Sequence, residues 1–241
     1  MLRTYIIILF FALTINGLAQ TNLSTNGFGG SSGDAASLFS GLKAVDYGRN
    51  DFGSKGNIEG TTYLFKNWNN SSTIWQGDKI FNLNSLNYNL QTESFEFKLN
   101  KDSVFIIGPD KNISKVVINN HVFKTYQKNN SNRNSFYEVI WENNDMSLLI
   151  EYNLKIKDGS IDPLTKNYIT PKQYGSEITY FVLEPNEEKI YPIKLKKSDI
   201  LKLIDESYVN KVKSFAKRRK LKYKEISDIK EILTYYYSIK S

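Results

Sequence analysis

Few residues of this chain could carry catalytic chemistry, because it contains one histidine and no cysteine. A metal site built on several histidines is therefore excluded, and a Ser-His-acid triad would depend on His121 alone. His121 follows Asn119-Asn120, a pair typical of a tight turn between strands, so a structural histidine at a strand edge is the simpler interpretation. The sequence has no HExxH motif, no P-loop and no strand-linked GxGxxG motif. We expect no cofactor and no metal, and the sequence does not favour an enzyme.

A pair of carboxylates is the remaining catalytic alternative, since one acid and one base or nucleophile can hydrolyse a glycosidic bond without histidine. The candidates near or on predicted strands are Glu93, Glu96, Glu138 and Glu151. Their alternation with apolar residues favours solvent-facing positions over catalytic ones. The oxygen-rich run 158–162 lacks the ligand series and closing Glu of an EF-hand, so it indicates a surface turn.

Aromatic and basic side chains are the candidate binding residues. Trp68, Trp75 and Trp141 could stack on a sugar, although strand-end or core positions are the favoured interpretation. Twelve Lys and Arg residues lie between positions 194 and 224 against three acidic residues, an excess larger than the +7 net charge of the whole chain. The candidate anion-binding residues are Lys211, Lys213, Lys217, Arg218, Arg219 and Lys220.

Three interpretations of this basic segment remain open. The cations could complement the dipole of a helix end, bind anionic lipid or another polyanion, or form a solvated face opposite an apolar stripe. The solvated face is favoured. If there is an anionic partner, an envelope location makes lipid or acidic glycan a better candidate than nucleic acid.

The first nineteen residues have the parts of a secretory signal peptide. Arg3 supplies the basic region, residues 5–13 are apolar, and Gly17-Leu18-Ala19 places small residues before a cleavage site. The apolar stretch is about half the ~20 residues that span a bilayer, and no later segment is apolar enough to stop transfer. We expect an exported protein, periplasmic or at the cell surface, that begins at Gln20 and keeps no transmembrane segment. Without cysteine it has neither disulfides nor a lipidated cysteine.

Period-two alternation dominates the middle of the chain and predicts short strands with hairpin turns and no helices between them. The predicted strands are 61–66, 73–76, 79–90, 95–99, 104–107, 116–118, 122–126, 136–141, 146–156, 178–183 and 190–195. In strand 95–99, Glu96 and Lys98 should form a solvated face. Residues 157–177 are polar and contain two Gly and two Pro, so they indicate a long loop, a better place for function than the strands.

Helical spacing begins at Ser198, which can cap a first helix carrying Ile200 and Ile204. The apolar stripe continues through Val209, Val212, Phe215 and Ala216. A last helix should follow Ser227, with an inner face of Ile229, Ile232, Leu233, Tyr236 and Tyr237. The domain organisation we expect is a signal peptide over 1–19, a flexible leader and loop over 20–59 with a short helix at 35–45, an antiparallel β domain over 60–196, and a basic helical segment over 197–241 packed on the sheet.

Several short motifs follow one another in an order that resembles exported, β-rich envelope proteins of Gram-negative bacteria with no assigned activity. The motifs are residues 60–65 (GTTYLF), 87–89 (NYN), 136–139 (FYEV), 196–201 (KKSDIL) and 228–237. The resemblance implies an envelope location and one continuous domain of strands followed by helices.

Together these observations predict an α+β fold. We expect mainly an antiparallel β-meander, as a large twisted sheet or an open barrel or sandwich, with two or three C-terminal helices packed on it. The expected function is a non-catalytic binding or structural module of the cell envelope, whose partner is an envelope protein or glycan. The alternatives are anionic lipid or polyanion binding through the basic helix, and a histidine-free glycan hydrolase.

Overall fold

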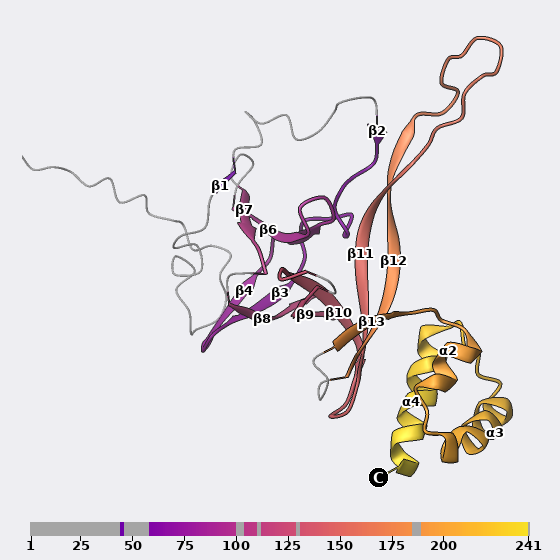
Figure 1. Cartoon of the computed structure of the whole chain (residues 1–241). Coiled ribbons are helices and arrows are strands. Elements are labelled where there is room, and N and C mark those ends of the chain that lie inside the picture. The colour runs from indigo at the N-terminus through magenta and orange to yellow at the C-terminus, as the bar shows by residue number, and fades with distance from the viewer. Residues whose placement is uncertain are drawn as a thin grey trace, which may run out of the picture.

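The computed structural model describes residues 44–45, 58–99, 104–109, 112–128, 131–184 and 189–240. Within these ranges the chain has the predicted α+β fold, with two sheets followed by helices (Figure 1). The strands are β1 (Ala44–Val45), β2 (Ile58–Glu59), β3 (Ser72–Gln76), β4 (Lys79–Leu83), β5 (Leu86–Asn89), β6 (Ser94–Lys98), β7 (Val104–Ile107), β8 (Ile113–Ile118), β9 (His121–Gln127), β10 (Asn134–Glu142), β11 (Ser147–Lys157), β12 (Lys172–Glu184) and β13 (Lys189–Ile193). The helices are α2 (Lys197–Lys202), the 3-10 turn η2 (Glu206–Tyr208), α3 (Val209–Arg219) and α4 (Ile226–Lys240).

In the larger sheet, strands β8 to β13 form the predicted antiparallel meander, and β3 and β4 extend it beside β8. The strand order of this sheet is β13-β12-β11-β10-β9-β8-β3-β4, and the short β2 adds a parallel pair at one edge of β12. The β8–β9 turn uses Asn119 and Asn120 at φ 47° and 68°, the positive values that Asn tolerates in a two-residue hairpin. A smaller sheet of order β1-β7-β6-β5 comes from the chain between β4 and β8 and from β1.

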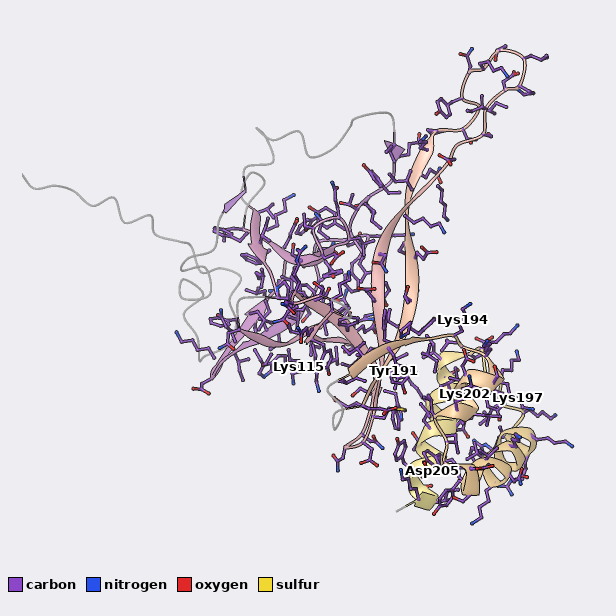
Figure 2. All side chains as sticks on the ribbon, in the orientation of Figure 1. Lys115, Tyr191, Lys194, Lys197, Lys202 and Asp205 are labelled. Carbon is purple, nitrogen blue, oxygen red and sulfur yellow. The ribbon has the colours of Figure 1, made fainter. Side chains whose placement is uncertain are left out.

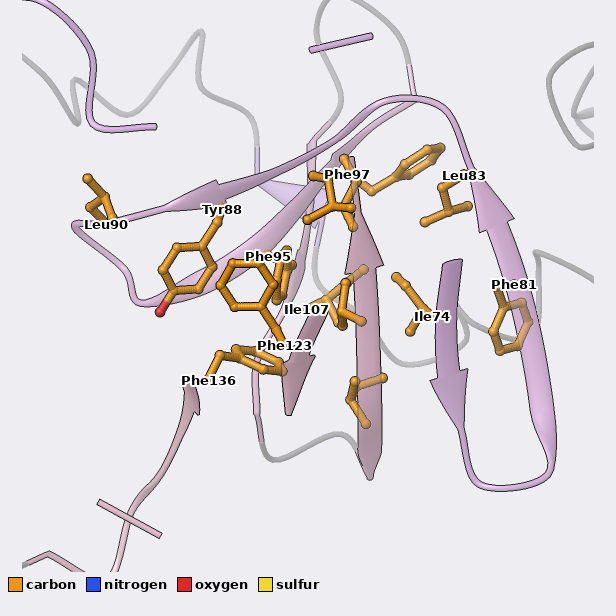
Figure 3. Close-up of a cluster of buried hydrophobic side chains, with 14 residues drawn as sticks. Ile74, Phe81, Leu83, Tyr88, Leu90, Phe95, Phe97, Ile107, Phe123 and Phe136 are labelled. Atoms are coloured by element: carbon orange, nitrogen blue, oxygen red, sulfur yellow. The ribbon is translucent and has the colours of Figure 1, made fainter. Parts of the chain in front are cut away.

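The first hydrophobic core lies between the two sheets and is rich in aromatic rings (Figure 3). Phe95 of the smaller sheet contacts Phe136 and Phe123 of the larger one edge-on, with ring centroids 4.8 and 5.2 Å apart. Tyr88 lies 5.0 Å from Phe95 and 5.8 Å from Phe123. Edge-to-face aromatic pairs add stabilisation beyond the burial of their area, so this cluster fixes the smaller sheet on the larger.

The second core joins the helices to the larger sheet, as the sequence predicted. Leu148, Ile150 and Val182 of the strands are buried with the helical side chains. From α4, Ile229, Ile232 and Leu233 are fully buried and Tyr236 nearly so, which confirms most of the predicted inner face. Glu138 lies opposite both Phe123 of the first core and Ile150 of the second, so both cores cover the same face of the larger sheet.

The structure corrects several local expectations. Residues 61–66 are not a strand. Only Tyr63 forms a bridge, to Asn89, because the Asn87 side chain bonds both the N–H and the C=O of Phe65. The predicted strand 79–90 is two strands, β4 and β5, which belong to different sheets.

Other corrections lie near the ends of the chain. Ala44–Val45 pair with β7 as strand β1 where the end of a helix was predicted; residues 35–43, the signal peptide and most of the leader lie outside the described residues. Helix α2 begins after Lys196 and has no side-chain cap, because Ser198 is already its second residue, where its hydroxyl bonds Asp199. None of the helices in the described part of the chain is long and apolar enough to cross a membrane.

Candidate functional site

The structure contradicts the expectation that Glu138 faces solvent. Its side chain is 10% exposed and lies on the core face, where Oε1 is 2.8 Å from His121 Nδ1 and Oε2 accepts a hydrogen bond from the Tyr152 hydroxyl. Burial, and then the hydrogen bond to Glu138, raise the pKa of Tyr152 above its ordinary value. Within the described ranges no serine or threonine hydroxyl bonds His121 Nε2. The geometry therefore joins an imidazole, a carboxylate and a phenol without a nucleophile.

Glu96 is also buried, against expectation. Its Oε2 accepts from the Tyr63 hydroxyl at 2.7 Å, and its Oε1 accepts from Asn89 Nδ2 at 2.8 Å. With no exposed surface, this carboxylate has no access to a substrate. Its position holds the segment around Tyr63 against the smaller sheet, which is a structural role.

Glu93 and Glu151 are the two candidate carboxylates that the structure brings together, and Glu151 is also buried, against expectation. Both pair with the Lys128 ammonium, at 3.4 and 3.0 Å. Burial raises the pKa of Tyr137 nearby, and the charges of Glu151 and Glu93 raise it further. Glu93 borders a hollow of about 210 Å³, but Glu151 does not. A glycosidase needs its two carboxylates on either side of a bound sugar, whereas here a lysine lies between them.

The three tryptophans have separate neighbours and form no common platform. Trp68 contacts Tyr63 edge-on at 4.8 Å, and Trp75 has the Lys115 ammonium 3.8 Å from its ring centroid. Trp141 donates from Nε1 to the Thr234 hydroxyl at 3.0 Å. Trp141 therefore joins β10 to α4, as the core interpretation implied.

The predicted basic residues lie on the solvent-facing side of α3 and at its C-terminal end. The inner side of α3 carries the buried Val212 and Ala216. Lys211, Lys213, Lys217, Arg218, Arg219 and Lys220 are all exposed. Arg219 pairs with Glu231 at 3.0 Å, and Lys211 lies over the Tyr208 ring at 5.6 Å. The other four make no ion pair with any described residue. Figure 2 shows that Lys194, Lys197 and Lys202 lie at the same end of the molecule as the C-terminal helices.

Strands β11 and β12 form the longest continuous ladder of the larger sheet, and their outer part projects as a two-stranded ribbon, here called the β11–β12 ribbon. Strands β11 and β12 pair from Ser147↔Leu183 to Lys157↔Gln173, but β10 leaves β11 after Glu138↔Ile150 and β13 leaves β12 after Tyr180↔Ile193. Beyond these positions two strands continue alone, apart from the short β2 contact, and project from the body (Figure 1). The predicted loop 157–177 is therefore shorter, because β12 already begins at Lys172.

Exposed apolar side chains concentrate on this ribbon. Within the described ranges, every exposed large hydrophobic residue except Ile80 lies on it. The exposed fractions are 47% for Ile156, 49% for Ile161, 91% for Leu164, 57% for Tyr168, 66% for Ile169 and 44% for Ile178. Sequence reasoning placed function in this region but missed these residues, because Ile161, Leu164, Tyr168 and Ile169 follow neither helical nor strand spacing.

The end of the ribbon, residues 158–171, is here called the tip loop, and most of its N–H groups are bonded within it. Asp162 Oδ1 accepts from the N–H groups of Leu164 and Thr165 at 2.8 and 3.1 Å. The other internal bonds are Ser160 N–H to Thr170 Oγ1, Asp162 N–H to Asn167 O, Lys166 N–H to Asp162 O, Asn167 N–H to Thr165 Oγ1, and the N–H groups of Ile169 and Thr170 to Ser160 O. The hydrogen bonds from the N–H groups of Leu164 and Thr165 lower the pKa of Asp162. Internal hydrogen bonds thus hold the tip loop in this shape.

Acidic side chains of the tip loop are used internally and gather no metal site. Asp158 pairs with Lys172 at 3.2 Å, and Asp162 caps the turn. Throughout the described part of the chain, no group of His, Asp and Glu side chains is arranged to hold a metal ion. The turn itself lies just beyond the predicted run 158–162, at residues 163–165, while Ile161 bridges to Tyr168.

We compared the chain with protein families, curated proteins and solved structures. The chain shows no significant match to any protein-family model, curated protein or solved structure.

Proposed function

We propose that the protein is an exported, non-catalytic binding module of the bacterial cell envelope and that the β11–β12 ribbon is its binding surface. The observation that carries the proposal is the concentration of exposed apolar side chains on the outer ribbon, with Leu164 almost fully exposed. Contiguous exposed apolar surface is unusual on a soluble protein unless another surface covers it. The export signal and the resemblance to envelope proteins support the location.

The paired strands give the ribbon two chemically different faces. Directly opposed residues of an antiparallel ladder share a face, so Ile156 and Tyr174 lie on one side together with Tyr152 and Ile178. On the other side Lys155 pairs with Glu177 at 3.0 Å. The ribbon is therefore amphipathic, and its apolar face extends from Tyr152, which packs against the first and second cores, to Ile156, which is 47% exposed.

The proposal is tested by capture of interacting components from an envelope extract on the mature chain, residues 20–241. We compare the unmodified protein with Leu164→Ser/Ile169→Ser and with Ile80→Ser, which removes the exposed large hydrophobic side chain of β4, outside the ribbon. We expect the ribbon variant alone to lose the retained component, because only it removes the binding surface. Equal retention by all three proteins, each shown to be folded by circular dichroism, would rule out the ribbon as the binding surface.

A second candidate function is anion binding through α3. The observation that favours it is the set of exposed cations Lys213, Lys217, Arg218 and Lys220, which have no acidic partner among the described residues. Such cations release counterions when they bind a polyanion, so binding should weaken steeply with salt. On a heparin column, Lys217→Glu/Arg218→Glu should elute at lower salt than Lys66→Glu/Lys79→Glu, which changes the net charge equally. Equal elution of the two variants would assign retention to net charge and not to α3.

A further inference from the structure

We infer that the tip loop inserts its apolar side chains into the interfacial layer of a lipid bilayer. The inference rests on the proposed function and names what the ribbon binds. Insertion requires apolar side chains that a flat surface can reach. The tip loop lies at the far end of the ribbon, whereas α2, α3 and α4 lie at the opposite end of β11 and β12 (Figure 1).

The side chains of the tip loop suit the boundary between head groups and acyl chains. Leu164 and Ile169 are the two most exposed large hydrophobic residues of the described chain, and Ile161 is half exposed. Tyr168, 57% exposed, adds an aromatic ring with a polar end, the type of side chain enriched at membrane interfaces. A convex apolar tip needs no matching cavity in a deformable lipid layer, whereas a protein partner would have to provide a groove.

Backbone hydrogen bonding lowers the cost of insertion for the most exposed part of the loop. An N–H group transferred from water into an apolar medium without a partner costs several kcal/mol, so unpaired donors keep loops out of lipid. In the tip loop the N–H groups of Leu164 and Thr165 bond Asp162, and that of Ile169 bonds Ser160. Pro163 has no N–H to satisfy. The loop can therefore leave water without stranding these donors.

Charge complementarity favours an anionic lipid surface. The acidic groups of this region are engaged, Asp158 by Lys172 and Asp162 by backbone N–H groups. Lys157 and Lys166 are exposed and form no ion pair with any residue that the structure describes. A lysine next to an inserting apolar side chain places its ammonium at the level of the phosphates.

The test is sedimentation with vesicles made of phosphatidylcholine and phosphatidylglycerol in equal parts, or of phosphatidylcholine alone. The variants are Leu164→Ser/Ile169→Ser in the tip loop and Ile156→Ser/Ile178→Ser, which removes similar exposed side chains from the shaft of the ribbon. We expect the tip variant to bind mixed vesicles at least about tenfold more weakly, since two inserted side chains are lost. The shaft variant should bind as the unmodified protein does, and binding to phosphatidylcholine alone should be weaker.

A second measurement reports how deeply the tip loop enters the bilayer. Emission from a Leu164→Trp variant should be quenched by brominated acyl chains, and emission from Ile178→Trp should not. Absence of vesicle binding, equal binding by the tip and shaft variants, or binding lost only in Lys217→Glu/Arg218→Glu would each overturn the inference. If the tip variant loses its captured component while no protein binds vesicles, the inference fails and the proposed function stands. If capture is unaffected as well, both fail.

Discussion

The Tyr152 hydroxyl donates a hydrogen bond to Glu138 at the fork where β11 leaves β10. Glu138, opposite Ile150, is at the last paired position of these strands, and Tyr152 is on the ribbon just beyond it. This contact joins the base of the ribbon to the meander, between the two hydrophobic cores. The direction in which the ribbon projects therefore depends on a buried polar contact as well as on apolar packing.

Removal of the Tyr152 hydroxyl should destabilise the protein. In Tyr152→Phe the buried Glu138 carboxylate keeps His121 as a partner but loses the phenol, and hydrogen bonds to charged groups contribute about 1.5–3 kcal/mol. We expect a fall of that size in the free energy of unfolding, measured by urea denaturation. The control is Tyr174→Phe, because no hydrogen bond of the Tyr174 hydroxyl is seen in the described structure. Equal effects of the two substitutions would contradict this role for Tyr152.

Alkaline pH should destabilise the fold through its buried tyrosines. Burial, and then the charge of Glu142, raise the pKa of Tyr126 from 10.0 to about 12. A raised pKa in the folded state means that the folded chain holds this proton more tightly than the unfolded chain does. The contribution to stability is complete below about pH 10 and is lost as the pH rises through about 12.

The change that tests this is Tyr126→Phe. The free energy of unfolding of the variant should fall less steeply than that of the unmodified protein between about pH 10 and 12, because one of the coupled protons is gone. Urea denaturation across this range provides the measurement, and the phenolate absorbance of the folded proteins provides an independent titration. Parallel curves for the two proteins would show that Tyr126 titrates normally.

Local signals predicted the parts of the fold that depend on neighbours in the sequence. Asn119-Asn120 predicted the β8–β9 hairpin because these residues accept positive φ, and the alternation from Met146 to Ile156 predicted β11. The helical spacing of Ile229, Ile232 and Leu233 predicted the inner face of α4. In each case the period of the side chains matches that of the element.

The sequence could not predict features that depend on distant partners. The burial of Glu96 requires the Tyr63 hydroxyl and the Asn89 amide, which reach it from other segments. Residues 172–177 form a strand because β11 pairs with them, although Gly175 weakens their own preference. The exposed side chains of the tip loop have no period, so only the structure shows that nothing in the described chain covers them.

Gly159 should be required for the shape of the tip loop. A Cβ atom added there would lie 1.9 Å from the carbonyl oxygen of Thr170, a distance that the backbone must move to relieve. Gly159→Ala should therefore disrupt the bonds of Ile169 and Thr170 to Ser160, with faster hydrogen exchange at those two amides. The effect on global stability should be small, because the tip loop is remote from both cores. Gly175→Ala is the control, since its nearest neighbour is the flexible Lys157 side chain at 3.2 Å. Unchanged exchange in Gly159→Ala would contradict the requirement.

The C-terminal helices should unfold together with the sheet. Leu233 of α4 is fully buried among strand and helix side chains, and truncation of a buried leucine to alanine costs about 2–5 kcal/mol. We expect Leu233→Ala to lower the unfolding midpoint by the same amount whether it is followed by far-ultraviolet circular dichroism or by tryptophan fluorescence. Two reporters that agree indicate one cooperative unit, because the helices contribute to the first signal, whereas Trp68 and Trp75 report on the strands and their connections and Trp141 reports on the contact between β10 and α4. Thr234→Ala on the exposed side of the same turn is the control and should cost only the hydrogen bond from Trp141, about 0.5–1.5 kcal/mol. A helical transition that separates from the fluorescence transition in Leu233→Ala would instead make the basic helices a separate folding unit from the β domain.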